Sequence, residues 1–443
     1  PNQTIVGMAQ TFVGSNNINL LEPVGQFGSR LLGGKDASSP RYIHTHLTKV
    51  ARAVFLPDDI PVLKHLDDDG LPVEPEWYAP VVPMLLVNGS EGIGTGYSTS
   101  IPAHNPDAIV AAIRSRLAGD ATPVELGLPW WRGFRGTTTL MDGGKKVHLT
   151  GTVTKTGYNT LVISELPVGT WTKTYRESLE KMIAGSPAAA GSKKPAILRD
   201  IVDEYNDIDV KITLEFLTGE LTKLESSGKL LKTLGLETTV HLTNMWAYDP
   251  SGKLHKYETA DDILDDYYTA RLDVYTRRRE HRIEELTREH TMLSAKAAFI
   301  MAVRDGSLDL RTDDTTLLAA LQARATDFPP LSGSDSGSDA LSGWRYLLNM
   351  PVRSLTDAKR DTLLRERGAV EAEIDRLRSA APESLWATDL DAFETVYHTF
   401  LAEREEVDKA TAEESTNSRT EAAPKKIIRR RRRQQKTFIP TKR

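Results

Sequence analysis

Residues 259–304 constrain the fold of this chain more than any other stretch, because they carry coiled-coil spacing. Seam residues recur there at alternating steps of three and four, the spacing with which two helices pack along one line. The seam positions are Ile283, Leu286, His290, Leu293, Ala297 and Ile300. A second amphipathic stretch, containing Leu363 and Ile374 and ending near Ala380, predicts a return helix. The sequence therefore predicts a long antiparallel helix pair.

Length and composition set outer limits on the class of protein. The chain has 443 residues, too many for one core, so we expect two to four domains. It is 39% hydrophobic and 26% charged, which is typical of soluble globular proteins, and no apolar run or leader predicts a membrane partner. The absence of cysteine excludes disulfide scaffolds, thiolate zinc sites and cysteine nucleophiles. Because it begins at Pro1, we expect a part of a longer polypeptide or one piece of a split enzyme.

Charge is unevenly distributed along the chain. The net charge is −5, but residues 259–405 are acidic and residues 406–443 are basic and polar. Binding to DNA would therefore depend on local clusters of basic side chains rather than on bulk charge. In the tail, Lys425, Lys426 and 429–433 predict a nuclear-import signal or a non-specific DNA tether.

An arginine stands directly before a tyrosine at Arg41-Tyr42, between a glycine-rich run and a predicted helix that starts at Thr45 and ends before Pro57. Tyrosine has a pKa of about 10 and is a poor nucleophile unless a cation or base favours the phenolate. A neighbouring arginine is such a cation, and it also binds phosphate oxygens. From these two residues alone, the alternative is a half-buried aromatic beside a surface charge.

Two further motifs leave a functional and a structural interpretation open. Residues 88–96 are rich in glycine but lack the lysine and spacing of a phosphate loop. Ile93, between glycines, is either a buried loop residue or an apolar wedge that inserts between base steps. In residues 130–136, aromatics alternate with Arg132 and Arg135, a pattern that suits either DNA contact or core packing.

Several long motifs in one order resemble a type IIA DNA topoisomerase, of the eukaryotic and large-DNA-virus branch rather than bacterial gyrase. The motifs similar to the winged-helix domain are residues 7–21, 25–30, 33–43, 73–78 and 88–96. Those similar to the tower domain and exit gate are 163–168, 170–175, 207–212, 243–245 and 344–351. The resemblance covers about residues 5–405, and it departs from the family at Gly169, where an arginine is expected.

The resemblance implies an α+β protein with four parts. These are a winged-helix DNA-cleavage domain, a mixed α/β tower domain, a long antiparallel coiled coil with a small helical exit gate (C-gate), and a disordered basic tail. Their expected bounds are 1–118, 119–258, 259–405 and 406–443.

The resemblance also assigns the site. Tyr42 would attack a DNA phosphate and form a 5′-phosphotyrosyl link, and Arg41 would stabilise the transition state. Ile93 would intercalate and bend the DNA. The remaining expected DNA contacts are Lys35, Arg30, Arg132 and Arg135. For Lys35 a plain surface charge is the alternative.

Cofactors and partners follow from the same resemblance. Mg²⁺ and ATP would be bound by metal-binding and ATPase domains that are not in this chain, either on the same full-length chain or on a separate polypeptide. No metal site is expected here, because the acidic run 67–69 is predicted to be a turn. The other partners are double-stranded DNA and a second copy, in a homodimer through the C-gate. The location would be the nucleus in a eukaryote, or the host nucleus, a cytoplasmic virus factory or the virion in a virus.

Three functions compete at this point. The leading one is the DNA breakage-and-reunion portion of an ATP-dependent type II topoisomerase. The second is a catalytically silent paralogue that binds and bends DNA, against which the intact Arg41, Tyr42 and Ile93 speak. The third is a nuclease or recombinase that uses a covalent tyrosine; the predicted coiled coil favours a dimer gate instead.

Overall fold

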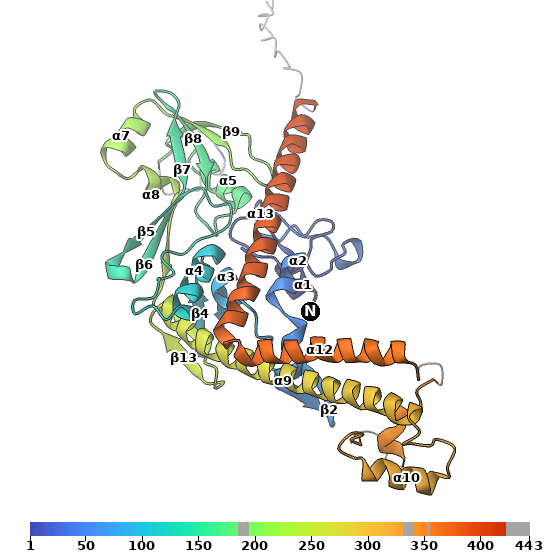
Figure 1. Cartoon of the computed structure of the whole chain (residues 1–443). Coiled ribbons are helices and arrows are strands. Elements are labelled where there is room, and N and C mark those ends of the chain that lie inside the picture. The colour runs from blue at the N-terminus through green and yellow to red at the C-terminus, as the bar shows by residue number, and fades with distance from the viewer. Residues whose placement is uncertain (185–194, 331–340, 352–354, 422–443) are drawn as a thin grey trace, which may run out of the picture. The chain divides into compact units, whose positions relative to one another are not determined.

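A computed structural model describes residues 1–184, 195–330, 341–351 and 355–421 (Figure 1). The predicted insert at 185–195, the insertion at 329–343 and the basic run at 425–433 lie wholly or largely outside the described residues. Contacts divide the chain into two compact units, each assembled from separate stretches. Unit 1 comprises Pro1–Thr48, Leu128–His241 and Tyr397–Arg443, and unit 2 comprises Lys49–Gly127 and Leu242–Val396. The predicted domain bounds stay a prediction.

Unit 1 is built around an antiparallel sheet in the order β7-β8-β10-β9. Alternate side chains of β8 and β10, such as Leu161, Ile163 and Leu214, are buried, as expected for strands with one face on a core. A second sheet has the order β11-β6-β5. The strands are β5 Thr137–Met141, β6 Lys146–Thr150, β7 Thr152–Lys155, β8 Thr160–Glu165, β9 Leu198–Asp203, β10 Ile212–Phe216 and β11 Glu237–His241.

Helices cover the first sheet of unit 1. Tyr175 and Leu179 of α5, together with Leu221 of α7 and Leu234 of α8, complete its buried core. The helices are α1 Asn2–Ala9, α5 Thr172–Glu180, α7 Glu220–Ser226 and α8 Leu230–Leu234, with the 3-10 turns η1 Pro40–Tyr42 and η3 Asp142–Gly144. Helix α13, Pro382–Glu421, gives its part from Tyr397 onward to this unit.

Unit 2 contains the predicted long helix pair. Helix α9 and helix α12 pack side by side (Figure 1). Their seam buries Leu286 against Ile374 and Leu377, and Ile300 against Leu363. The predicted antiparallel pair is therefore confirmed. The helices are α2 Lys49–Val54, α3 Met84–Asn88, α4 Pro106–Leu117, α9 Ala260–Arg304, α10 Asp314–Ala323, α11 Arg345–Leu348 and α12 Asp357–Ser379, with the 3-10 turns η2 Pro57–Val62 and η4 Ser342–Trp344.

Short hairpins make up the β-structure of unit 2. The expected turn at the acidic run is confirmed, since it joins β1 to β2 with Asp69 and Gly70 at positive φ. The strands are β1 His65–Asp68, β2 Leu71–Pro75, β3 Ser90–Ile93, β4 Ser98–Ile101, β12 Met245–Tyr248 and β13 Leu254–Tyr257.

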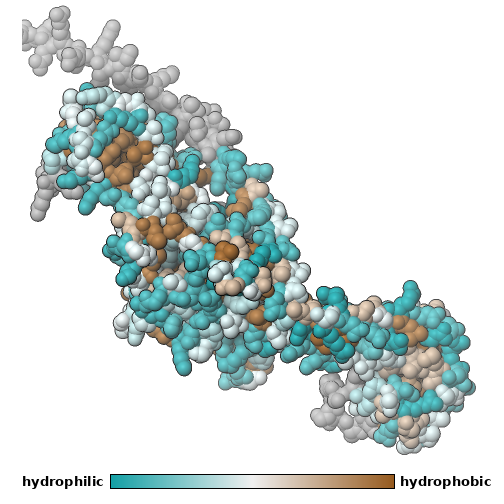
Figure 2. Space-filling model, turned by 60° about the vertical axis from the view of Figure 1, so that its left-hand side comes forward, coloured by the Kyte–Doolittle hydropathy of each residue, from teal (hydrophilic) through white to brown (hydrophobic). Residues whose placement is uncertain are grey.

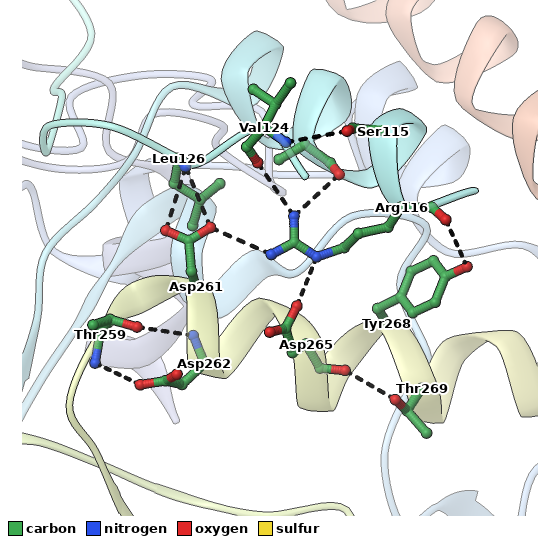
Figure 3. A network of polar contacts seen from close by, with 11 residues as sticks. Ser115, Arg116, Val124, Leu126, Thr259, Asp261, Asp262, Asp265, Tyr268 and Thr269 are labelled. Carbon is green, nitrogen blue, oxygen red and sulfur yellow. Dashed lines mark hydrogen bonds and ion pairs between the residues drawn. The ribbon is translucent and has the colours of Figure 1, made fainter. Parts of the chain in front are cut away.

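The start of α9 is fixed by polar contacts (Figure 3). Thr259 and Asp262 form a capping box, in which each side chain accepts a hydrogen bond from the other residue's backbone N–H. The largely buried guanidinium of Arg116, at the end of α4, bonds Asp265 at 2.7 Å and Asp261 at 3.4 Å. These contacts hold α4 against the root of the long helix.

The far end of the α9–α12 pair carries a small helical cluster. Trp344 is buried there with Phe299 and Phe328, and its indole N–H donates to the Phe328 carbonyl at 2.7 Å. This cluster lies where the sequence predicts the exit gate. On the face drawn in Figure 2, hydrophobic side chains form small patches within a polar surface. Within the described part of the chain, no helix has both the length and the apolar content needed to cross a membrane.

Two local expectations differ from the structure. The helix expected from Thr45 begins only at Lys49, because the residues before it pair with an extended segment: Leu47 bridges Leu21, and the Thr48 N–H donates to the Leu20 carbonyl at 3.1 Å. Helix α13 also continues to Glu421, into the segment for which composition predicts disorder. Helix-supporting pairs such as Glu405–Lys409, four residues apart, account for part of that extension.

Candidate active site

The Arg41-Tyr42 pair lies on an exposed 3-10 turn of unit 1. Pro40 starts this turn with a fixed φ, and the Tyr42 N–H closes it by donating to the Ser39 carbonyl at 2.9 Å. The Tyr42 side chain is 67% exposed. The Arg41 guanidinium carbon lies 4.9 Å from the centre of the Tyr42 ring, which is a cation–π contact. A phenol and a permanent positive charge are thus presented together to solvent.

Backbone pairing braces this turn on both sides. His44 and Val24 exchange hydrogen bonds of 3.0 and 3.1 Å, and before the turn the Ser38 N–H donates to the Gln26 carbonyl at 2.9 Å. The chain on either side of Tyr42 is therefore held against the segment around 24–26. This restricts where the phenol oxygen can move, and such positioning is what nucleophilic catalysis needs.

The glycine-rich loop before the turn is tightly packed. Gly33 has a φ of +62°, and a Cβ atom there would lie 2.2 Å from the Trp171 ring. The Asp36 carboxylate accepts from the Ser29 N–H at 2.9 Å and from the Ser29 hydroxyl at 2.5 Å. Lys35 lies on this fixed loop with an exposed side chain. Its predicted DNA contact stays a prediction.

Arg30 has internal partners. Its side chain is 3% exposed and forms an ion pair with Glu165, which is 1% exposed. The same guanidinium donates to the Leu166 carbonyl at 3.1 Å. The expected DNA contact of Arg30 stays untested, but these contacts give it a structural role, because they hold the loop before Tyr42 against the end of β8.

The two arginines of the aromatic-rich segment differ in their surroundings. Arg132 donates to the Thr11 carbonyl at 2.9 Å, its N–H donates to Asn17 at 2.8 Å, and burial lowers its pKa. Arg135 is exposed and pairs with Asp209. Of the two, Arg135 has the more accessible charge, and contact with DNA stays a prediction for both.

Ile93 belongs to unit 2 and ends strand β3 of a hairpin. It is 93% exposed, although a large aliphatic side chain is usually buried. The hairpin is anchored to β12: the Trp246 N–H donates to the Thr99 hydroxyl at 3.1 Å, and the rings of Tyr97 and Trp246 lie 5.3 Å apart. An isoleucine at the tip of an anchored hairpin has the geometry of a wedge.

The search for metal ligands gives a plain result. Among the described residues, no three or more His, Cys, Asp or Glu side chains gather where they would hold a metal ion. The donor set for Mg²⁺ is therefore not supplied by this part of the chain, and no step below depends on a metal bound here.

Sequence reasoning missed two residues that shape the site. Glu165 neutralises Arg30 and also accepts from the Arg135 N–H at 3.1 Å, and Glu22 supports the segment after Tyr42. Glu165 lies within a family-like motif, but a motif does not name the partner of a charge. An isolated glutamate at the end of an apolar strand was the one available signal.

Comparison with known proteins defines the class first. A protein-family model for the A chain of DNA gyrase and topoisomerase IV matches residues 2–391. The chain therefore belongs to this family of type II DNA topoisomerases, as the sequence motifs predict.

The particular relatives are eukaryotic. Mouse DNA topoisomerase 2-beta is 38% identical over 436 residues, which cover 93% of this chain and 26% of the relative. Human DNA topoisomerase 2-alpha is 38% identical over 88% of this chain and 27% of its own length. The crystal structure of the Plasmodium falciparum topoisomerase II DNA-binding, cleavage and re-ligation domain is 35% identical with a TM-score of 0.80, covering 92% of this chain and 56% of that one. The predicted fold is confirmed, and the chain spans about a quarter of the length of the curated relatives it matches.

Proposed function

We propose that this chain is the DNA breakage-and-reunion portion of an ATP-dependent type II DNA topoisomerase, with Tyr42 as the nucleophile. The observation that carries the proposal is the exposed Tyr42 phenol, in contact with Arg41 on a braced turn. The family match and the similarity to a structure titled as a cleavage and re-ligation domain support it.

The chemistry is an exchange of phosphate esters. The Tyr42 oxygen forms a bond to phosphorus and loses its proton, while the bond from phosphorus to the 3′-oxygen breaks and that oxygen takes up a proton. The product is a 5′-phosphotyrosyl ester with a free 3′-hydroxyl. Because one ester replaces another, the reverse reaction reseals the strand without a nucleotide.

Arg41 and Ile93 have separate roles in this proposal. The Arg41 guanidinium donates to the phosphoryl oxygens as negative charge develops on them. Ile93 enters the stack of bases and bends the DNA, which its exposure at the tip of an anchored hairpin supports. Lys35, Arg132 and Arg135 are proposed backbone contacts, with Arg132 the least accessible of the three.

The remaining machinery is assigned to other parts of the enzyme. Metal-binding and ATPase domains, on the same full-length chain or on another polypeptide, would bind Mg²⁺ and ATP. Magnesium, when bound, stabilises charge on the phosphate and the leaving oxygen. The helical cluster at the end of α9 and α12 would form the C-gate of a homodimer acting on double-stranded DNA. The location follows the source, being nuclear in a eukaryote and the host nucleus, a virus factory or the virion in a virus.

The test is formation of a covalent protein–DNA adduct. The chain is incubated with supercoiled plasmid and magnesium, with and without the metal-binding portion of the same enzyme, and stopped with detergent. We expect a 5′-linked adduct only when both portions are present, and none with Tyr42→Phe. Tyr158→Phe is a matched control, since Tyr158 is 71% exposed in the same unit.

Other outcomes select the competing functions. A bent but uncleaved plasmid in the complete mixture would favour the silent DNA-bending paralogue. A 3′-linked adduct would favour a recombinase. An adduct formed by this chain alone with magnesium would contradict the assignment of the metal site to another domain.

A further inference from the structure

Glu22 connects the segment that follows Tyr42 to helix α13. Its N–H donates to the His46 carbonyl at 2.9 Å, and its carbonyl accepts from the Thr45 hydroxyl at 2.9 Å. The Glu22 side chain is not used in these bonds. It forms an ion pair with Arg404 of α13 instead. One residue therefore binds both a helix and the segment three to four residues beyond the nucleophile.

Arg404 is itself held in place. Its side chain is 13% exposed and that of Glu22 is 33% exposed. The Arg404 guanidinium lies 5.7 Å from the centre of the Phe400 ring, and the Arg132 guanidinium lies 5.3 Å from the same ring. Phe400 is buried. An arginine ordered by a ring and sheltered from water forms a stiffer ion pair than two mobile surface charges do.

The surroundings of this pair are charged. Burial raises the pKa of the nearby Asp408 carboxyl, while Arg132 and Arg404 act to lower it. Asp408 and Glu22 thus both have a favourable interaction with Arg404. This end of α13 is a charged contact with the segment that supports Tyr42, in addition to the apolar packing of Phe400.

We propose that Glu22 and Arg404 are positioning residues for Tyr42. Through Glu22, Arg404 fixes the backbone at Thr45 and His46, and with it the height and direction from which the Tyr42 phenol approaches a phosphate. The inference rests on the proposed function, because it assigns these residues to the cleavage step. A shift of about 1 Å in a reacting group costs about 100-fold in rate, so a modest loosening is measurable.

The experiment uses the complete enzyme, with its metal-binding portion, in single-turnover cleavage of a plasmid. Arg404→Met keeps the apolar stem and removes the charge, Glu22→Gln removes the other charge, and Arg404→Lys is the conservative rescue. Arg176→Met is the matched control, because Arg176 in unit 1 is 19% exposed and pairs at 2.8 Å with Asp203, which is 33% exposed.

We expect Arg404→Met and Glu22→Gln each to slow adduct formation by about 10- to 100-fold, with DNA affinity within about twofold of wild type. The double variant should be no slower than either single variant, since both remove one contact. Arg404→Lys should recover most of the rate, and Arg176→Met should cleave as wild type. Hydrogen exchange at residues 44–46 should quicken in Arg404→Met and not in Arg176→Met.

The two possible failures are distinguishable. If the wild-type enzyme forms no adduct, the proposed function fails. If it forms one and Arg404→Met cleaves at the wild-type rate, the positioning role alone is overturned. Loss of cleavage together with DNA affinity and thermal stability, without rescue by lysine, would also overturn it, by showing a structural role for the pair.

Discussion

Replacing Glu165 by glutamine should destabilise unit 1 more than any single change at an exposed charge. The Glu165 carboxylate accepts from Arg30, from the Leu166 N–H at 2.7 Å and from the Arg135 N–H at 3.1 Å. Glutamine has the same shape but no charge, so the buried Arg30 guanidinium would lose its counter-charge. Removing one partner of a buried ion pair costs about 3–5 kcal/mol.

The partner variant and the double variant sharpen this prediction. Arg30→Met leaves the Glu165 carboxylate with two backbone donors, so its cost should lie at the lower end of that range. The double variant should cost clearly less than the sum of the two single variants, because neither charge then remains buried alone. Arg199→Met removes one partner of an exposed pair with Glu215 and should cost no more than about 1 kcal/mol.

Urea unfolding followed by tryptophan fluorescence measures these differences, since Trp130, Trp131 and Trp171 report on unit 1. A cost below about 1 kcal/mol for Glu165→Gln, or single costs that simply add, would refute the reasoning. The first result would mean that Arg30 reaches water or another acceptor. The second would mean that Arg30 and Glu165 do not interact.

Three further predictions concern pH, packing and the exposed hairpin. Burial lowers the pKa of His104 from 6.5 to about 4, so the unfolded chain takes up the proton first; stability should fall by up to about 3 kcal/mol as pH drops from about 6.5 to about 4, and His104→Gln should flatten that part of a urea-midpoint profile. Gly33→Ala should lower stability by about 1–3 kcal/mol, because its Cβ meets the Trp171 ring at positive φ, whereas Gly7→Ala, in helix α1 with no atom within 4 Å of the new Cβ, should be neutral or slightly stabilising in the same thermal melts. Ile93→Ser should change the unfolding free energy by less than about 0.5 kcal/mol, since the side chain is almost fully exposed, yet it should reduce DNA bending measured by energy transfer between dyes at the two DNA ends; unchanged bending would exclude the wedge.

Local patterns in the sequence predicted the elements that depend on near neighbours. The coiled-coil spacing predicted α9 to within a residue, because positions three and four apart share one helix face whatever surrounds them. The turn at Asp69-Gly70 was predictable for a similar reason, since it depends on the backbone freedom of a few adjacent residues. Where a distant segment intervened, the local pattern was wrong: Leu47 fits a helical repeat but pairs with Leu21 instead.

The sequence by itself determined that this chain has a long helix pair, a glycine-rich loop before Arg41-Tyr42, and motifs of a type II topoisomerase. Only the tertiary structure decided which charges are free to meet DNA. Arg30 and Glu165 are 135 positions apart, and Glu22 and Arg404 are 382 apart. Partners so distant in the chain are brought together by the packing of whole elements, and no spacing rule within one element predicts them. The tyrosine was therefore readable from the sequence, whereas the residues that hold it in position were not.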